Sequence, residues 1–282
     1  MKIEDVEVYG FRKAFHGMRN AMDSWDNADS LFWGKSKLST PFPETSFKPT
    51  YSWNCDVYVP ELPDIGEKDL ELACNLIKRG SEHRKFLRQI IIWMDITIPR
   101  YVWQELDTYK VATVRNSCST MNKLGSRDLT QDDFELPICE LTLERINLLA
   151  RLLREAKSVH ENVQQTRRQL KNELCEGYLQ KATYMLNYET ALSVILQRQN
   201  HRLPEWKLVC DSGSITDFLI SLPYMFNFYM AATEKKRILR RCIDNLSSLI
   251  VSDHFDKRRV DADFDIINSE LISILADIKK AV

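Results

Sequence analysis

The spacing of apolar side chains changes along the chain between two periods, and each period predicts a different element. Residues 2–9, KIEDVEVY, alternate weakly between apolar and polar side chains and predict a strand. Residues 89–98, QIIIWMDITI, are β-branched and apolar, so they predict a second strand, which Pro99 ends. Apolar residues at intervals of three or four predict helices at 11–25, 67–80, 100–110 and, approximately, 142–157, 159–196, 224–250 and 260–280.

These elements predict an α+β protein, mostly helical with a small antiparallel sheet. The length is compatible with a single domain over residues 1–282. Residues from about 34 to 66 hold most of the prolines and predict a long irregular connection. Asp64 and Glu67 have the spacing of a capping box for the helix that follows. The segment at about 260–280 predicts a C-terminal amphipathic helix.

Composition excludes several classes of protein. The formal net charge is −1, so no global field attracts nucleic acid or a membrane surface, and any anion site must be local. The seven cysteines form no CxxC pair, and an odd number without a signal peptide fits reduced thiols. No apolar run approaches about 18 residues, so we expect no membrane helix. We therefore expect a cytoplasmic protein that binds neither nucleic acid nor membrane.

Motifs for metals and for phosphate loops are absent from the sequence. The five histidines stand in no HxxxH or HExxH spacing, so we expect no metal site. The eight glycines form no glycine-rich phosphate loop. The basic runs at 235–241 and 256–259 fit solvated faces better than nucleic-acid contacts.

The segment 107–121, DTYKVATVRNSCSTM, concentrates donors and positive charge without an acidic residue after Asp107. Lys110 and Arg115 provide fixed positive charge, and Thr113 is one of several neighbouring hydroxyls. A phosphate group has suitable partners in such a segment. The alternative interpretation is a solvated polar loop whose cations bind nothing.

Cys118 in the same segment is a candidate nucleophile. A reactive thiol needs a lowered pKa, and neighbouring Arg115 is a group that can lower it. No base is identifiable beside it, so an ordinary thiol is the better interpretation. The sequence therefore assigns no catalytic residue.

Residues 197–206, QRQNHRLPEW, form a second dense cluster of donors. Arg198, His201 and Arg202 stand among three amide side chains and close to Trp206. Guanidinium and amide groups fit a base or a phosphate, which makes this cluster a candidate binding site. Cations at the end of a helix also stabilise the helix dipole, and that alternative accounts for Arg198 or Arg202 without a ligand.

Two segments resemble the flavin-dependent thymidylate synthases. Residues 76–86, LIKRGSEHRKF, resemble the family's Lys/Arg-Gly-His-Glu-Ser turn, and residues 96–106, ITIPRYVWQEL, resemble the segment that leads into its signature motif. The resemblance extends from the start of the chain to about residue 250 and is strongest over 70–125. It implies the fold of that family, FAD as cofactor, a pyrimidine nucleotide monophosphate as ligand, and a homo-oligomer, the family's tetramer with sites shared between subunits.

The family's signature motif consists of Arg-His-Arg, a spaced Ser, an Asn-Glu pair, a second Ser and a closing Arg-Tyr. The matching positions in this chain hold, in the same order, Thr108, Tyr109, Lys110, Thr113, Arg115, Asn116, Cys118, Thr120 and Met121. The resemblance implies a nucleotide site whose candidate residues are Lys110, Thr113, Arg115, Cys118, Arg198 and Arg202. It implies a FAD site whose candidate residues are Tyr109, Asn116 and His201.

A later motif of the family has its nearest match in residues 211–223, DSGSITDFLISLP. The family shows Asn-Ala-Arg, then His-Phe-Leu and an Arg that binds the nucleotide. The Asn, Arg and His fall here on Asp211, Gly213 and Asp217. These positions therefore carry none of the family's cations, and the 197–206 cluster is a candidate source of replacements.

Two functions follow from the sequence and remain open. The first is a thymidylate synthase in which FAD carries the hydride that reduces a methylene group delivered to deoxyuridylate from a folate. The second is a non-catalytic descendant that keeps the fold and a nucleotide pocket, and acts as a binding or interaction protein. The substitutions in the motif favour the second, whereas the preserved framework and the cations favour the first.

Overall fold

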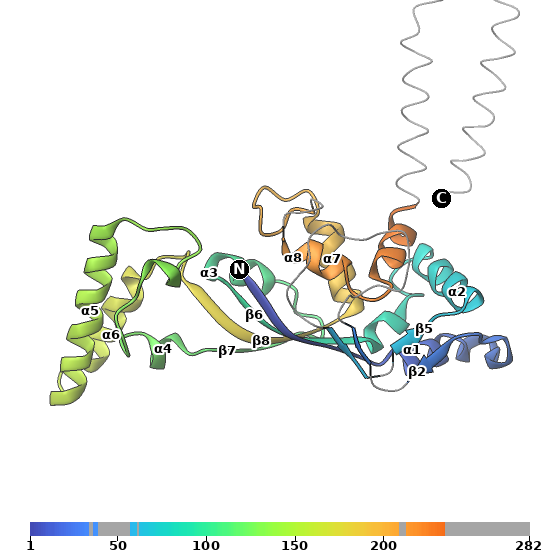
Figure 1. The fold of residues 1–282 in the computed structure, drawn as a ribbon, viewed down its shortest axis with the longest axis horizontal. Coiled ribbons are helices and arrows are strands. Elements are labelled where there is room, and N and C mark those ends of the chain that lie inside the picture. Colours follow the sequence, from blue (N-terminus) through green and yellow to red (C-terminus); the bar gives the residue numbers. More distant parts are fainter. Residues whose placement is uncertain (34–35, 39–56, 61, 209–212, 235–282) are drawn as a thin grey trace, which may run out of the picture.

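A six-stranded sheet forms the centre of the molecule (Figure 1). The computed structural model describes residues 1–33, 36–38, 57–60, 62–208 and 213–234. In their order across the sheet, the strands are β3 (Ser36–Leu38), β4 (Val57–Val59), β1 (Lys2–Tyr9), β6 (Ile91–Pro99), β8 (Leu179–Asn187) and β7 (Val114–Ser117). Neighbouring strands are antiparallel except β1 and β4, so one parallel pair joins the antiparallel sheet that the sequence predicts.

The strands predicted at the start of the chain and before Pro99 are confirmed by β1 and β6. The single helix predicted at 159–196 is wrong, because β8 lies inside that range and pairs with β6 along its whole length. Ala182, Tyr184 and Leu186 of β8 belong to the core, and Lys181, Thr183 and Met185 between them are more exposed. Such alanine and leucine residues also suit a helix, so pairing with β6 decides the conformation rather than local preference.

Short strands interrupt the connection predicted at about 34–66. β2 (Leu31–Trp33) pairs antiparallel with β5 (Leu62–Asp64) in a separate two-stranded sheet, and β3 pairs with β4. The prediction of an irregular connection is therefore wrong for the described part of this range. Strands of three residues have no readable period, so their partner strands determine them.

The helices are α1 (Phe11–Met18), α2 (Glu67–Lys78), α3 (Arg100–Leu106), α4 (Thr120–Lys123), α5 (Glu140–Val159), α6 (Val163–Glu173), α7 (Tyr188–Arg198) and α8 (Ile215–Ile220). Short 3-10 turns occur at Asn20–Met22, Trp25–Asn27, Lys85–Gln89 and Gln131–Asp133. The helices predicted at 67–80 and 142–157 are confirmed by α2 and α5.

Of the other predicted helices, two are shorter in the structure and two lie partly or wholly outside its described part. The helix predicted at 11–25 ends at Met18, and the one predicted at 100–110 ends at Leu106. Residues 225–234 are helical. The remainder of the segment predicted at 224–250, and all of that at 260–280, lie outside the described residues.

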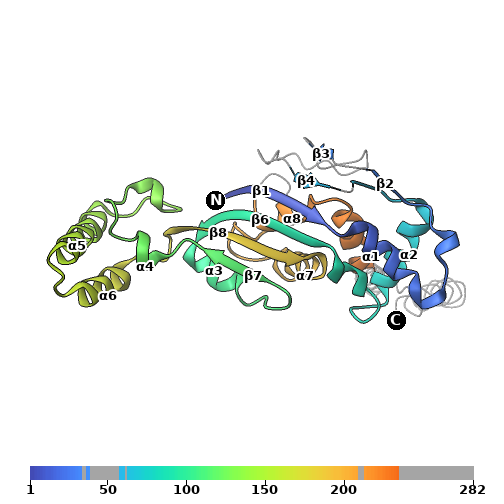
Figure 2. The ribbon, with the colours of Figure 1, turned by 90° about the horizontal axis from the view of Figure 1, so that it is seen from below.

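Helices cover one face of the sheet. In Figure 1, α3, α7 and α8 lie above the strands, and the view from below shows β1, β6 and β8 with no described helix in front of them (Figure 2). The buried side chains of β6 belong to one core cluster with those of the covering helices; on β6 they are Ile92, Met94, Ile96 and Ile98. On the opposite face Trp93 is 42% exposed, so the described residues leave this face of the sheet open at β6.

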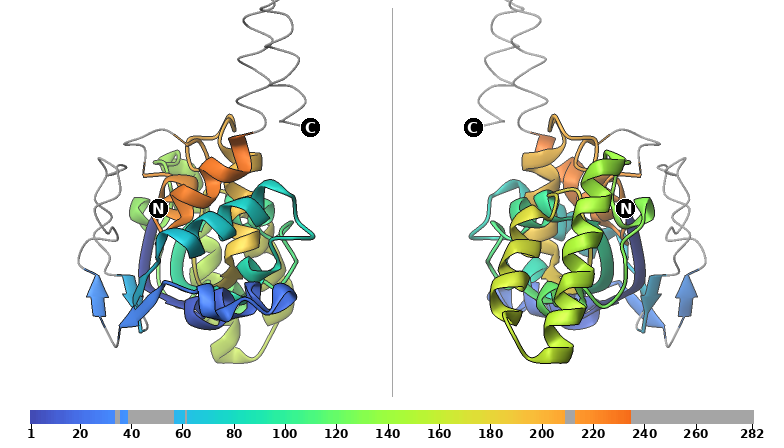
Figure 3. Two further views of the ribbon diagram at one scale, coloured as in Figure 1. Left: turned by 90° about the vertical axis from the view of Figure 1, so that its right-hand side faces the viewer. Right: turned by 90° about the vertical axis from the view of Figure 1, so that its left-hand side faces the viewer.

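The hairpin of α5 and α6 projects from one end of the sheet (Figures 1 and 3). It has a separate core cluster, formed by Leu124, Leu129, Phe134, Ile146, Ala150, Leu153, Leu170 and Leu174. Asp128 joins the preceding loop to α5 through ion pairs of 2.5 Å to Arg151 Nη2 and 2.6 Å to Arg154 Nη2. A single domain over 1–282 stays a prediction.

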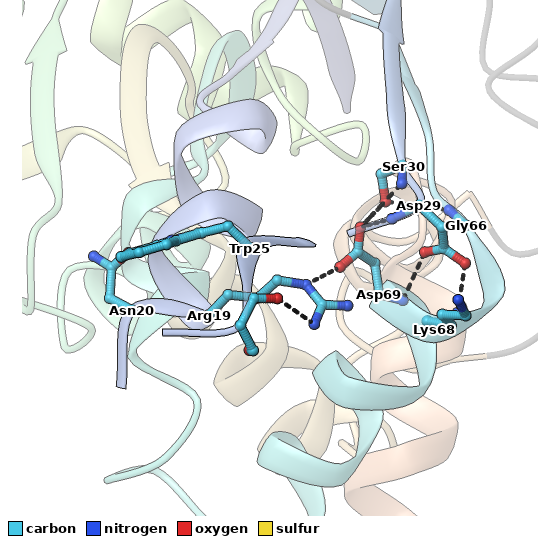
Figure 4. Close-up of polar contacts among 9 residues, drawn as sticks. Arg19, Asn20, Trp25, Asp29, Ser30, Gly66, Lys68 and Asp69 are labelled. Atoms are coloured by element: carbon cyan, nitrogen blue, oxygen red, sulfur yellow. Dashed lines mark hydrogen bonds and ion pairs between the residues drawn. The ribbon is translucent and has the colours of Figure 1, made fainter. Parts of the chain in front are cut away.

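A buried ion pair links α1 to α2 at the end of the molecule opposite the α5–α6 hairpin (Figure 4). Arg19 Nε lies 2.6 Å from Asp69 Oδ1, and both side chains are at least 95% buried. The other carboxylate oxygen of Asp69 accepts hydrogen bonds from the Ser30 hydroxyl at 2.6 Å and the Ser30 amide at 3.0 Å. One carboxylate of α2 thus holds both the end of α1 and the start of β2.

The start of α2 is capped from a distant part of the chain. Asp29 accepts hydrogen bonds from the backbone amides of Lys68 at 2.9 Å and Asp69 at 3.0 Å (Figure 4). The capping box predicted for Asp64 is wrong, because Asp64 ends β5 and Gly66 is the N-cap residue. A Cβ atom at Gly66 would lie 2.2 Å from Asp29 Cγ, so this cap requires glycine there.

Candidate functional site

A pocket of about 340 Å³ lies along α7. We call it the α7 pocket; its lining residues are Arg88, Thr108, Tyr109, Lys110, Val111, Glu189, Thr190, Ser193 and Gln197. They come from the 3-10 turn before β6, from the turn after α3, and from α7. The Thr190 hydroxyl donates to the Val111 carbonyl at 2.9 Å and so fastens the turn after α3 to α7.

The local sequence explains how α7 presents its residues. Asn187, the last residue of β8, caps α7, because its Oδ1 accepts a hydrogen bond from the Thr190 amide at 2.8 Å. Glu189, Ser193 and Gln197 follow at intervals of four residues and therefore share one face of the helix. That face forms one wall of the α7 pocket.

The charges that line the α7 pocket are two cations and one carboxylate. Lys110 and Arg88 are exposed, and Lys110 has no ion pair with any residue that the structure describes. The carboxylate of Glu189 is neutralised by an ion pair with Arg84. Arg84 Nε lies 2.9 Å from its Oε2 and donates to its Oε1 at 3.1 Å. The pocket therefore presents the positive charge of Lys110 and Arg88 to an anion.

The hydroxyl groups around the turn donate their protons within the chain. Thr108 donates to the Glu105 carbonyl at 2.7 Å, and Thr113 donates to the Tyr109 carbonyl at 2.7 Å. Ser193 donates to the Glu189 carbonyl at 2.9 Å. The two cations, rather than the hydroxyls, are thus the charged donors that remain for an anion in this pocket.

Tyr109, Arg198 and His201 form one connected network. Arg198 Nη1 lies 2.8 Å from Glu105 Oε2 and 2.9 Å from His201 Nε2. Arg198 Nε donates to the Tyr109 hydroxyl at 3.1 Å, and that hydroxyl donates to Gln197 Oε1 at 3.1 Å. The guanidinium also lies 5.1 Å from the centre of the Trp206 ring. Arg198 is therefore engaged within the protein, and the chain of bonds fixes the amide of Gln197 at the α7 pocket.

Trp206 itself is fully buried. The Glu205 carboxylate beside it accepts a hydrogen bond from the Tyr101 hydroxyl of α3. Burial and this bond together raise the pKa of Tyr101. The part of the 197–206 cluster that follows α7 is thus packed against α3, while Arg202 is exposed and does not line the α7 pocket.

The remaining residues of the 107–121 segment lie apart from the α7 pocket, because this segment contains β7. Arg115 Nη1 pairs with Asp107 at 3.0 Å, and its guanidinium lies 4.8 Å from the centre of the Trp103 ring. Asn116 is exposed on β7 opposite Thr183 of β8. The interpretation of this segment as a polar loop is therefore wrong for residues 114–117, which form β7.

Cys118 is exposed and lines a second hollow of about 530 Å³ next to β8. Lys123, Arg127 and Lys181 line the same hollow, together with the carboxylates of Asp132 and Asp133. No histidine is among the lining residues. The structure thus places the predicted nucleotide residues Lys110 and Cys118 in different hollows.

The segment 211–223, matched above to the later family motif, forms a buried helix start in its described part. Ser214 and Asp217 cap α8 reciprocally, since the Ser214 hydroxyl accepts from the Asp217 amide at 3.1 Å and Asp217 accepts from the Ser214 amide at 3.4 Å. Residues 215–222 are buried. Asp217 therefore has a structural function in this helix.

Four residues of the α7 pocket lie outside the two segments, 107–121 and 197–206, that the sequence singles out: Arg88, Glu189, Thr190 and Ser193. Arg88 stands just after the 76–86 segment, whose resemblance to a family turn is the one local signal near it. The other three are interior to a range predicted as one long helix. Their convergence depends on the path of β8.

Among the described residues, no group of three or more histidine, cysteine, aspartate or glutamate side chains is arranged to hold a metal ion. None of the described helices is long and apolar enough to cross a membrane.

Comparison with known proteins identifies the fold. No protein-family model matches the sequence, and no curated protein matches it. Two solved structures of the flavin-dependent thymidylate synthase ThyX from Helicobacter pylori, each with FAD and dUMP, are similar to this chain. One has a TM-score of 0.52 at 15% identity and covers 81% of this chain and 98% of that one. The other has a TM-score of 0.52 at 14% identity and covers 82% and 99%. With its α+β architecture, this chain therefore has the fold of the flavin-dependent thymidylate synthases.

Proposed function

We propose that this protein binds a pyrimidine nucleoside monophosphate in the α7 pocket. The observation that carries the proposal is the pair of cations, Lys110 and Arg88, in a pocket whose lining carboxylate, Glu189, is already paired with Arg84. A phosphate group bound there gains charge-assisted hydrogen bonds. The volume of about 340 Å³ falls at the lower end of small-molecule sites and suits a mononucleotide.

The position of Lys110 supports the same proposal. By the resemblance described above, Lys110 stands where the thymidylate synthases carry the second Arg of their motif. The solved ThyX structures with this fold are complexes with dUMP. A cation thus persists at a family position and lines a pocket in this chain.

Gln197 supplies recognition of the base in this proposal. Its Oε1 accepts a hydrogen bond from Tyr109, so its amide nitrogen is available as a donor. The carbonyl oxygens of a pyrimidine are acceptors for such a group. In this proposal Arg198 is a positioning residue. It donates to the Tyr109 hydroxyl, and that hydroxyl fixes the Gln197 amide.

FAD fits these residues poorly. A flavin pyrophosphate needs several positive groups, and of the three positions that match the family's Arg-His-Arg only Lys110 is a cation. Thr108 and the Tyr109 hydroxyl are engaged within the chain. Tyr109 and His201 both contact Arg198, but Asn116 lies apart on β7, so the three candidates for FAD do not converge on one site. We therefore propose nucleotide binding without a flavin-dependent step.

Calorimetric titration tests the proposal. The ligands are dUMP and dTMP, with deoxyuridine, thymidine and inorganic phosphate as matched comparisons. We expect both monophosphates to bind more tightly than their nucleosides. Equal affinity for nucleotide and nucleoside would overturn the proposal. In parallel, quenching of FAD fluorescence by the protein with dUMP present would favour a flavin enzyme instead.

A further inference from the structure

Helix α5 has two apolar faces, and only one of them is covered by described residues. Its inner face packs in the core of the hairpin through Ile146, Ala150 and Leu153. On the outer face four apolar side chains are exposed: Leu141 at 74%, Leu148 at 55%, Leu152 at 42% and Val159 at 63%. We call these four residues the outer stripe.

The outer stripe has the spacing of a coiled-coil seam. Its residues follow one another at intervals of seven, four and seven. These are the a and d positions of a heptad, with Arg145 and Glu155 at the two other such positions within the helix. The stripe is therefore straight, runs the length of α5, and faces away from the hairpin core.

The stripe is also complementary to itself. Two copies of α5 can lie antiparallel about a two-fold axis that crosses the helices at the level of Ala150. Each a position then faces a d position of the other copy. Leu148 then faces Leu152, and Leu141 faces Val159. In the same arrangement Arg145 faces Glu155, so the charged position that interrupts the stripe meets its opposite charge.

We propose that the outer stripe of α5 is the contact surface for a second copy of this chain, joined through an antiparallel two-fold helix pair. Such an isologous contact uses the same patch on both subunits. It depends on the helix hairpin alone, and it does not depend on the proposed nucleotide site.

The charges favour a second copy as the occupant over an unrelated apolar segment. The Glu155 carboxylate has no ion pair with any described residue. Arg145 Nη2 pairs with Glu173 at 2.8 Å, yet its side chain is 66% exposed, so further donors of its guanidinium face solvent. A second copy supplies one partner for each of these groups at the matching level of the helix.

Sedimentation velocity of the full chain across a wide range of concentrations tests the contact. We expect the wild-type protein to exceed its chain mass of 33.0 kDa by a factor of two or a multiple of two. Leu148→Glu should halve the mass of the assembly, because it places two carboxylates inside the seam of each pair. The dissociation constant should rise about a hundredfold, which corresponds to ~2.7 kcal/mol. Leu136→Glu is the matched control, since Leu136 is 73% exposed but lies outside α5.

A charge exchange separates this contact from a simple loss of solubility. Arg145→Glu and Glu155→Arg should each weaken the assembly, and the double variant should restore most of it, because each copy again faces an opposite charge. Circular dichroism of every variant checks that its total helix content equals that of the wild type.

Two outcomes would overturn the proposal. One is a wild-type protein that stays at 33.0 kDa at every concentration, which would point to coverage of the stripe by another segment of the same chain or by a different partner. The other is a folded Leu148→Glu protein with the same mass as wild type.

Discussion

Arg198 Nη1 lies 2.8 Å from Glu105 Oε2, and this ion pair ties the end of α7 to α3. The same guanidinium contacts Tyr109, His201 and the Trp206 ring. The turn after α3 is therefore held against α7 at two points, here and where Thr190 donates to the Val111 carbonyl. The α7 pocket owes its shape to these two attachments.

Arg198→Ala should lower the free energy of unfolding by roughly 1.5–3 kcal/mol, because a charged hydrogen-bond partner is lost and the Glu105 carboxylate stays behind. Urea denaturation measures the loss. Arg202→Ala is the control, since Arg202 is exposed, and it should change stability by less than about 0.5 kcal/mol. Equal effects of the two substitutions would show that the Arg198 network contributes nothing specific.

Lys110→Ala should weaken dUMP binding by roughly 1.5–3 kcal/mol, or about ten- to a hundredfold in the dissociation constant, because one charge-assisted contact is removed. Affinity for deoxyuridine should not change, since the nucleoside has no phosphate. Lys110→Arg should keep most of the affinity. Titration calorimetry of the wild type and both variants, with dUMP and with deoxyuridine, measures these affinities.

Lys123→Ala is the matched control for that experiment, because Lys123 lines the separate hollow beside Cys118. It should leave the affinity for dUMP unchanged. Arg88→Ala should reproduce the effect of Lys110→Ala, since both cations line one pocket. If Arg88→Ala, like Lys123→Ala, leaves the affinity for dUMP unchanged, Arg88 and Lys110 do not contact the same ligand.

Asp69→Ala should destabilise the protein by roughly 3–5 kcal/mol, because it leaves the Arg19 guanidinium buried without its counter-charge. It also removes the acceptor for Ser30. Differential scanning calorimetry and urea denaturation measure the effect. Asp64→Ala, at an exposed aspartate of β5, provides the comparison and should cost little. A small loss in Asp69→Ala would contradict the buried pair.

The ion pairs that Asp128 forms with α5 should stabilise the protein less in acid. Hydrogen bonds from Arg151 and Arg154 lower the pKa of Asp128 to about 2, below its usual value of 3.8. A lowered carboxyl pKa in the folded state stabilises the fold above pH 3.8, and this stabilisation disappears as the pH falls toward 2. The melting temperature of Asp128→Asn should therefore lie below that of wild type at pH 5, and the difference should shrink between pH 3.8 and 2 and vanish below pH 2. A difference that is independent of pH would exclude this linkage.

Several elements could be predicted because their pattern is local. The alternation in residues 2–9, the apolar run at 89–98 and the amphipathic repeat at 142–157 each lie within one strand or helix, so neighbouring residues suffice to identify them. Lys110 was identifiable as a candidate cation from its own segment and from the family resemblance. In the structure Lys110 lines the α7 pocket, and its role as a ligand for phosphate stays a prediction.

What tertiary structure alone decided is the set of contacts between distant segments. β8 became a strand because β6 pairs with it along nine residues, although its own sequence also suits a helix. Arg84 and Glu189 are 105 residues apart, and their contact makes the α7 pocket net positive. Arg198, an equally plausible nucleotide ligand by sequence, is instead taken up by Glu105 across 93 residues. Local sequence determines which groups are available, but only packing determines which of them meet each other and which remain for a ligand.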